Sequence, residues 1–102
     1  MKVELLHTDE CPNWAETGTR LRIALDAVGK SDVDIDYLLL TTREETARHP
    51  FAGSPTILVD GEDPFPSGGP ISELACRVYQ TGTGLAGSPT TEQLVQVLRD
   101  RS

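Results

Sequence analysis

Cys11 is the residue of this sequence best placed for chemistry. It precedes Pro12 and Trp14 at the junction between a short apolar run and a stretch with helical spacing. Backbone N–H groups and the positive end of the helix dipole meet at the start of a helix, where they stabilise a thiolate, the nucleophilic form of cysteine. Asp9 and Glu10 come immediately before and oppose a further negative charge. The position predicts a reactive thiol whose ionisation depends on its solvation.

A second segment suited to chemistry is Gly53–Thr56, directly ahead of an apolar run. The peptide bond before a proline adopts the cis form at little cost, and a cis proline is usually a retained feature of a tight turn. We therefore expect the Ser54-Pro55 bond to be cis. Such a turn leaves its backbone available to a ligand.

Cys76 alternates with Leu74 and Val78, and free cysteines are among the most buried residues. This pattern predicts that Cys76 packs in the core, toward the turn of a hairpin and away from Cys11. Two cysteines in 102 residues are too few for a secreted scaffold held by disulfides, so thiols are expected. A Cys11–Cys76 bridge is the alternative.

The elements that must position these residues follow from hydrophobic spacing and from turn residues. Val3–His7 is expected to be a strand, and a helix is expected from Pro12, which suits the first helical position, to a stop at Gly29. The alternating residues 33–40 predict a second strand. The remaining elements are a short helix capped by Thr41 or Thr42 and ending at Arg48, a third strand over Thr56–Asp60, and a last helix with Ser88 as N-cap, Pro89 in its first turn and an end near Arg99.

Residues 71–81 fit both a helix and a strand, because their apolar residues match both spacings. A strand is favoured, since the third strand needs an antiparallel partner and the other candidate, residues 63–66, carries prolines where hydrogen-bond donors are needed. The expected order is β-α-β-α-β-β-α. One α/β domain over residues 1–102 results, with a central mixed four-stranded sheet whose first two strands are parallel.

Charge and hydropathy exclude several classes of protein. The net charge is −7, which disfavours binding to nucleic acid and to anionic membranes. No run approaches the ~20 apolar residues that span a bilayer, and the first residues do not form the apolar core of an export signal. A cytoplasmic protein is therefore expected, and since His7 and His49 have no ligand spacing, no metal site is predicted.

Together these features resemble the thioredoxin and glutaredoxin superfamily: a first strand, Cys-Pro-x-x at the start of the first helix, and Gly-x-Pro-Thr ahead of a later strand. The motifs C-P-x-W, G-S-P-T and A-C-R-x-Y are also similar to small thioredoxin-like proteins labelled alkylmercury-lyase-like. The resemblance implies a thioredoxin-like fold, with Cys11 as the nucleophile and Pro55 as the cis proline that faces it. The family's second cysteine falls on Trp14 here, so the C-x-x-C dithiol is incomplete.

The resulting hypothesis is a redox protein with a single active-site cysteine, whose catalytic residue is Cys11. Cys11 attacks a protein disulfide or a small disulfide, with glutathione as a candidate co-substrate, and an external thiol resolves the intermediate. The alternative is a module without turnover that captures a soft metal or an organomercurial as a thiolate complex. The predicted substrate-binding residues are Pro12, Trp14, Ser54, Pro55 and Thr56.

Overall fold

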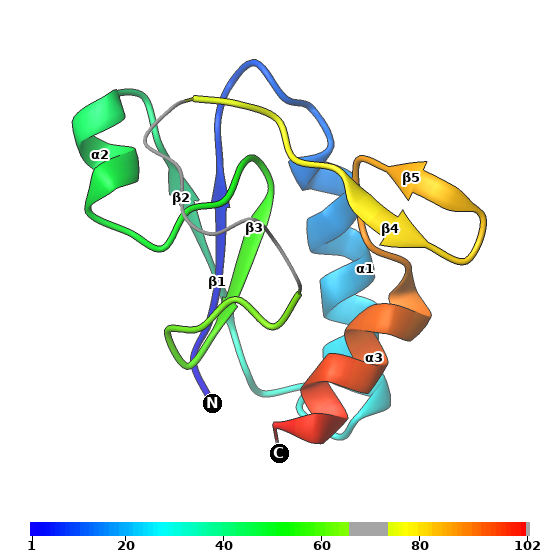
Figure 1. Ribbon diagram of the computed structural model, residues 1–102. Helices are drawn as coiled ribbons and strands as arrows, with labels where there is room; N and C mark the ends of the chain where they lie inside the picture. Colours follow the sequence, from blue (N-terminus) through cyan, green and yellow to red (C-terminus); the bar gives the residue numbers. More distant parts are fainter. Residues whose placement is uncertain (66–73, 102) are drawn as a thin grey trace.

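Three strands form the central sheet of the computed structural model, which describes residues 1–65 and 74–101. The strand order is β2–β1–β3 (Figure 1). β1 (Val3–His7) lies in the middle, parallel to β2 (Ile35–Leu39) and antiparallel to β3 (Thr56–Val59). The predicted mixed sheet with parallel first strands is therefore confirmed.

Helices cover both faces of this sheet. α1 (Trp14–Ala27) and α3 (Thr91–Asp100) lie together on one face, and the short α2 (Arg43–Ala47) lies on the other (Figure 1). Because both faces are covered, all four residues of β3 are buried, which explains why apolar residues follow one another over Ile57–Val59 without alternation. The core on the α1 side contains Val3, Leu5, Leu21, Ala24, Leu25, Ile57, Val59, Leu94 and Leu98, and the core on the α2 side contains Leu6, Leu40, Phe51 and Leu58.

α1 ends where the sequence predicted, but it does not start there. Gly29 follows the helix with a φ of +78°, and the N–H groups of Gly29 and Lys30 donate to the carbonyls of Asp26 and Leu25. This pattern is a Schellman stop, so the predicted end is confirmed. The start differs, because Asn13 is the N-cap and Pro12 lies before the helix rather than in its first position.

None of the helices in the described part of the chain has the length and the apolar composition of a membrane span.

The last helix begins later than the sequence predicted. Thr90, not Ser88, is the N-cap: its Oγ1 accepts a hydrogen bond from the Gln93 N–H, and the Gln93 side chain accepts one from the Thr90 N–H. This capping box satisfies two N–H groups at once, which a serine two residues earlier could not do. Ser88 Oγ instead accepts a hydrogen bond from Thr17 and joins the start of α3 to α1.

Replacing the cap tests this assignment. Thr90→Ala is expected to lower the free energy of unfolding by about 1 kcal/mol, because the Gln93 N–H loses its acceptor. Ser88→Ala, which leaves the capping box intact, serves as the comparison in the same urea titration. An unchanged free energy of unfolding in Thr90→Ala would contradict the observed cap.

Within residues 1–65 and 74–101 the predicted four-stranded sheet is not observed, and the chain forms a separate hairpin instead. β4 (Tyr79–Thr81) pairs antiparallel with β5 (Gly84–Ala86), and neither strand joins the central sheet. The element order is therefore β-α-β-α-β-β-β-α. The tight turn at Gly82-Thr83 places β5 beside β4. β4 therefore pairs with the next segment of the chain rather than with the distant β3. The first part of the predicted strand, 71–73, lies outside the described residues.

Candidate functional site

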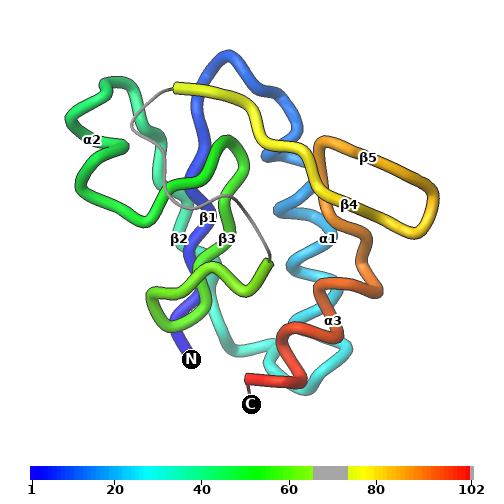
Figure 2. The backbone as a smooth tube through the Cα atoms, in the orientation of Figure 1, coloured from blue at the N-terminus to red at the C-terminus, as the bar shows by residue number. Residues whose placement is uncertain are grey.

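Cys11 and Cys76 form a disulfide bond. Their Cα atoms are 5.7 Å apart, although the residues are separated by 65 positions in the sequence. The expectation that Cys76 packs in the core, away from Cys11, is therefore wrong, and the bridge that was the alternative is present. Figure 2 shows how this happens: the chain from residue 74 crosses the end of the molecule where the loop after β1 leads into α1.

The two cysteines differ in exposure. Cys11 is 1% exposed, whereas Cys76 is exposed. Residues 76–79 do alternate, as the sequence indicated, but in the opposite phase: Arg77 and Tyr79 are buried, and Val78 is 64% exposed. The exposed cysteine of the bridge is therefore the one that the sequence assigned to the core.

Backbone hydrogen bonds hold the Cys76 segment against the loop ahead of β3. The Ser54 N–H donates to the Ala75 carbonyl at 2.8 Å, and the Arg77 N–H donates to the Ser54 carbonyl at 2.9 Å. Gly53 makes this approach feasible: it has a φ of +114°, and a Cβ added to it would lie 2.8 Å from Arg77 Cβ. The Cys76 backbone is thus positioned by contacts that do not depend on the disulfide.

A buried ion pair anchors the same segment on its other side. Arg77 Nη1 lies 2.6 Å from Asp63 Oδ2, and the Arg77 guanidinium lies 4.4 Å from the ring centroid of Tyr79. The Tyr79 hydroxyl donates to the Pro55 carbonyl. Burial raises the pKa of Tyr79, so the hydroxyl keeps the proton that it donates.

The loop ahead of β3 has the predicted cis proline, at the Ser54-Pro55 bond. The hydroxyls of the neighbouring residues are used within the protein: Ser54 Oγ accepts from the Thr8 N–H, and Thr56 Oγ1 donates to the Gly53 carbonyl. Ser54, Pro55 and Thr56 are all buried. These three residues were predicted to bind substrate. They lie beneath the surface of the site, and their side chains do not face solvent.

Trp14 is partly exposed at the start of α1, and Pro12 is exposed beside it. The indole stacks on His7, with ring centroids 4.3 Å apart, and meets the Tyr37 ring edge-on at 5.9 Å. Burial lowers the pKa of His7, although Asp9 opposes this shift, so the stacked imidazole is neutral at pH 7. His7 was not predicted as a site residue, and only its position at the end of β1, four residues before Cys11, could have indicated it.

A small pocket adjoins the residues that carry the bridge. Its volume is about 120 Å³. Glu10 in its wall precedes Cys11 directly, and Leu74 lies two residues before Cys76. Thr8 also belongs to the lining, and its Oγ1 is buried without a hydrogen-bond partner among the described residues. The described residues that line it are Thr8, Asp9, Glu10, Leu40, Thr41 and Leu74.

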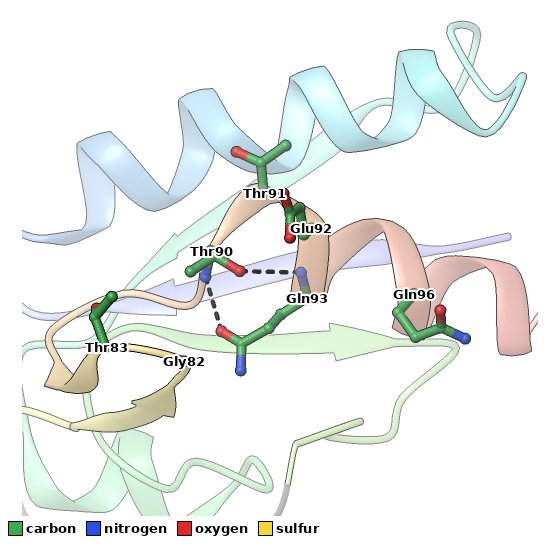
Figure 3. A pocket seen from close by; sticks show the side chains of 7 residues that line it. All are labelled: Gly82, Thr83, Thr90, Thr91, Glu92, Gln93 and Gln96. Atoms are coloured by element: carbon green, nitrogen blue, oxygen red, sulfur yellow. Dashed lines mark hydrogen bonds between the residues drawn. The ribbon is translucent and has the colours of Figure 1, made fainter.

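Two larger pockets contain neither cysteine nor a residue next to one. A pocket of about 580 Å³ lies between the β4–β5 turn and the start of α3 (Figure 3). The polar groups of Thr90 and Gln93 in its wall are already used by the capping box and by the Gln80 carbonyl. The second, of about 430 Å³, lies between α1 and β2 and includes Ile23 and Tyr37.

The chemical group at this site is a disulfide between one buried and one exposed cysteine. Within residues 1–65 and 74–101, no three His, Cys, Asp or Glu side chains gather closely enough to hold a metal ion. Comparison of the chain with protein-family models, with curated proteins and with solved structures finds no match.

Proposed function

We propose that this protein is a thioredoxin-like thiol–disulfide exchange protein whose redox pair is Cys11 and Cys76. The observation that carries this proposal is the bridge itself: it joins a buried cysteine ahead of α1 to an exposed one beside the cis-proline loop. Sequence analysis predicted a single active cysteine with no resolving partner. The proposal differs in that Cys76 supplies the second cysteine and forms the mixed disulfide, and Cys11 resolves it.

The arrangement of the elements supports a thioredoxin-like topology. β1, α1 and β2 form a parallel β-α-β unit, and β3 runs antiparallel beside β1. Cys11 lies between β1 and α1, and Pro55 lies at the start of β3 with a cis peptide bond. These are the positions that the resemblance assigns to the nucleophile and to the cis proline. A fourth strand paired with β3 is absent from the described residues.

Exposure determines the order of the exchange steps. An external thiolate attacks Cys76 Sγ and forms a mixed disulfide, while the S–S bond breaks and its electron pair leaves on Cys11 Sγ, which takes a proton from solvent. A second thiol then attacks the mixed disulfide, releases the oxidised small disulfide, and leaves Cys76 reduced. Two thiols are oxidised and one protein disulfide is reduced. The reverse sequence oxidises the protein with an external disulfide.

The contacts around Cys76 favour rapid closure of the bridge after reduction. The Ser54–Ala75 and Arg77–Ser54 hydrogen bonds and the Arg77–Asp63 ion pair involve no sulfur atom. They keep Cys76 beside Cys11 in the dithiol form, so the resolving step is intramolecular between prepositioned groups. A disulfide with a purely structural role would not need these additional hydrogen bonds and the ion pair at the same place.

Single-cysteine variants test this mechanism. Reduced Cys11→Ser, which keeps Cys76, is expected to form a mixed disulfide with the neutral reagent 2-hydroxyethyl disulfide about tenfold faster than reduced Cys76→Ser, because access controls the rate. Mass spectrometry follows the adduct. The wild type should instead return to the bridged form without accumulating adduct. The two variants lose the same bridge and are matched controls for one another.

Equal or inverted rates would contradict the assignment of Cys76 as the attacked sulfur. The proposed exchange function would be contradicted altogether if a dithiol did not reduce the wild-type bridge and 2-hydroxyethyl disulfide did not restore it. The second candidate, capture of a soft cation or an organomercurial, uses the same two sulfurs after reduction. It would be favoured if the reduced protein bound one Hg²⁺ with loss of both titratable thiols but showed no exchange.

A further inference from the structure

We infer that the edge of β2 that faces away from β1 (the open edge) is a docking site for an extended segment of a partner protein. The segment adds a strand to the central sheet, and its large apolar residues alternate with lysine or arginine. This inference goes beyond the proposed function, because it involves neither cysteine. It is carried by the direction of the β2 backbone groups, by the apolar side chains beside them and by two carboxylates.

The two edges of the central sheet differ in exposure. β3 is buried along its whole length, and the chain at both of its ends is bonded to other segments: the Val59 N–H donates to the Glu62 carbonyl, and the Ser54 N–H donates to the Ala75 carbonyl. β2 forms the other edge, outside β1 (Figure 1), and only its first and fourth residues are even partly buried. An exposed edge strand presents backbone donors and acceptors to a further chain.

The strand register shows which backbone groups of β2 form the open edge. The Leu40 N–H donates to the His7 carbonyl at 2.8 Å, so Leu40 directs its backbone groups toward β1. These groups alternate in direction along a strand, and those of Ile35, Tyr37 and Leu39 therefore point away from β1. Among the described residues, no other segment bonds to them. An extended chain is the ligand that matches donors and acceptors spaced along one line.

Apolar side chains lie on one face beside the open edge. Ile35 packs against the core on the α1 side, so Tyr37 and Leu39, at alternating positions, lie on the same face. The pocket of about 430 Å³ between α1 and β2 includes Tyr37 and Ile23, which are 47% and 52% exposed. Gly18 in its wall leaves room for the tyrosine ring, since a Cβ there would clash with the Tyr37 hydroxyl. Large apolar side chains of an added strand would be removed from water here.

The opposite face of the same strand carries negative charge. Asp34 and Asp36 are exposed and alternate with the apolar residues, on the side where Leu38 packs against the core near α2. Arg22 in the pocket wall is used within the protein, because its Nη1 donates to the Val33 carbonyl at 2.6 Å. Basic residues at every second position of an added strand would therefore lie beside the two carboxylates. A second copy of β2 supplies no cation, so a basic partner is favoured over self-association.

A designed peptide tests strand addition to the full-length bridged protein. The probe is Lys-Val-Lys-Phe-Lys-Val-Lys-amide with an N-terminal fluorescein, and fluorescence anisotropy measures its binding. Saturable binding is expected, and the same peptide with glutamate in place of lysine should bind at least about tenfold more weakly at low ionic strength. The absence of saturable binding by the lysine peptide would overturn the inference.

Backbone methylation separates strand addition from non-specific attraction between charges. One peptide is N-methylated at its valines and phenylalanine, and another at alternate lysines. Only one of these two sets of N–H groups faces β2 in an added strand, so one peptide should lose binding about tenfold while the other keeps it. Equal affinities of the two methylated peptides would overturn the inference.

Charge variants locate the binding site on the protein. Asp34→Asn combined with Asp36→Asn should weaken binding of the lysine peptide several-fold. Glu92→Gln combined with Asp100→Asn, which removes two exposed carboxylates from α3, should leave it unchanged. Equal effects of the two double variants would overturn the inference.

Apolar variants provide a second matched pair. Ile23→Ser should weaken binding of the lysine peptide several-fold, whereas Leu85→Ser, which removes a 70% exposed leucine from β5, should not. Equal effects would overturn the inference, as would a protein dimer in sedimentation that the peptide dissociates, because the open edge would then belong to a second copy. No thiol takes part in these measurements, so their failure leaves the proposed exchange function standing.

Discussion

The free energy of unfolding of Cys76→Ser is expected to lie about 4 kcal/mol below that of the bridged protein. The bridge joins residues 65 positions apart, and a crosslink that closes a loop of this size removes much conformational freedom from the unfolded chain. Since single domains are stable by only about 5–15 kcal/mol, this is a large share of the total. Urea titration of the variant and of the wild type measures the difference.

The reduced wild type provides the control for this result. It should lose a similar amount when titrated in the presence of a dithiol, whereas the dithiol should not change the stability of Cys76→Ser. A difference below about 1 kcal/mol between the bridged protein and both other forms would mean that the bridge does not constrain the unfolded chain as its length requires.

Arg77→Met is expected to cost about 3–5 kcal/mol of stability. The substitution keeps a long apolar stem but leaves the Asp63 carboxylate, whose side chain is 15% exposed, without its cation. Restoring neutrality should recover most of the loss: in Arg77→Met with Asp63→Asn, the amide oxygen still accepts from the Phe65 N–H. Urea titration of the single and double variants separates the unpaired charge from the lost packing.

Arg101→Met is the matched comparison for this experiment. Arg101 Nη1 lies 3.9 Å from Glu62 Oε2 at the surface, where such pairs contribute about 1 kcal/mol or less. A similar loss at both arginines would show that the burial of Arg77 has no special energetic role. A double variant as unstable as Arg77→Met would show that packing, rather than charge, dominates.

The strands and helices with local signals were predictable from the sequence. Val3–His7 is a strand as expected, Thr42 caps α2, and Gly29 stops α1, because apolar spacing and capping residues are properties of neighbouring positions. The cis Pro55 was also predictable, since it depends on a proline in a turn ahead of a strand. The site residues identified in this way were Cys11 and the loop ahead of β3.

The features that were not predictable depend on partners distant in the sequence. Cys76 was assigned to the core because it alternates with Leu74 and Val78, but Arg77 lies inside instead, paired with Asp63 and over the Tyr79 ring. Sequence periodicity finds alternation but not its phase when a buried ion pair replaces an apolar side chain. The wrong phase of this alternation explains both the misplaced Cys76 and the missed bridge.

The bridge also divides the chain into a covalent ring and two tails. The ring from Cys11 to Cys76 contains α1, β2, α2 and β3, whereas β1 and α3 belong to the tails. A force that pulls the two termini apart passes through the sulfur atoms and leaves the ring slack, so roughly 220 Å of chain cannot be drawn out while the bridge is intact. Reduction releases this length, and the thiol state of the protein would then determine how far it extends under tension.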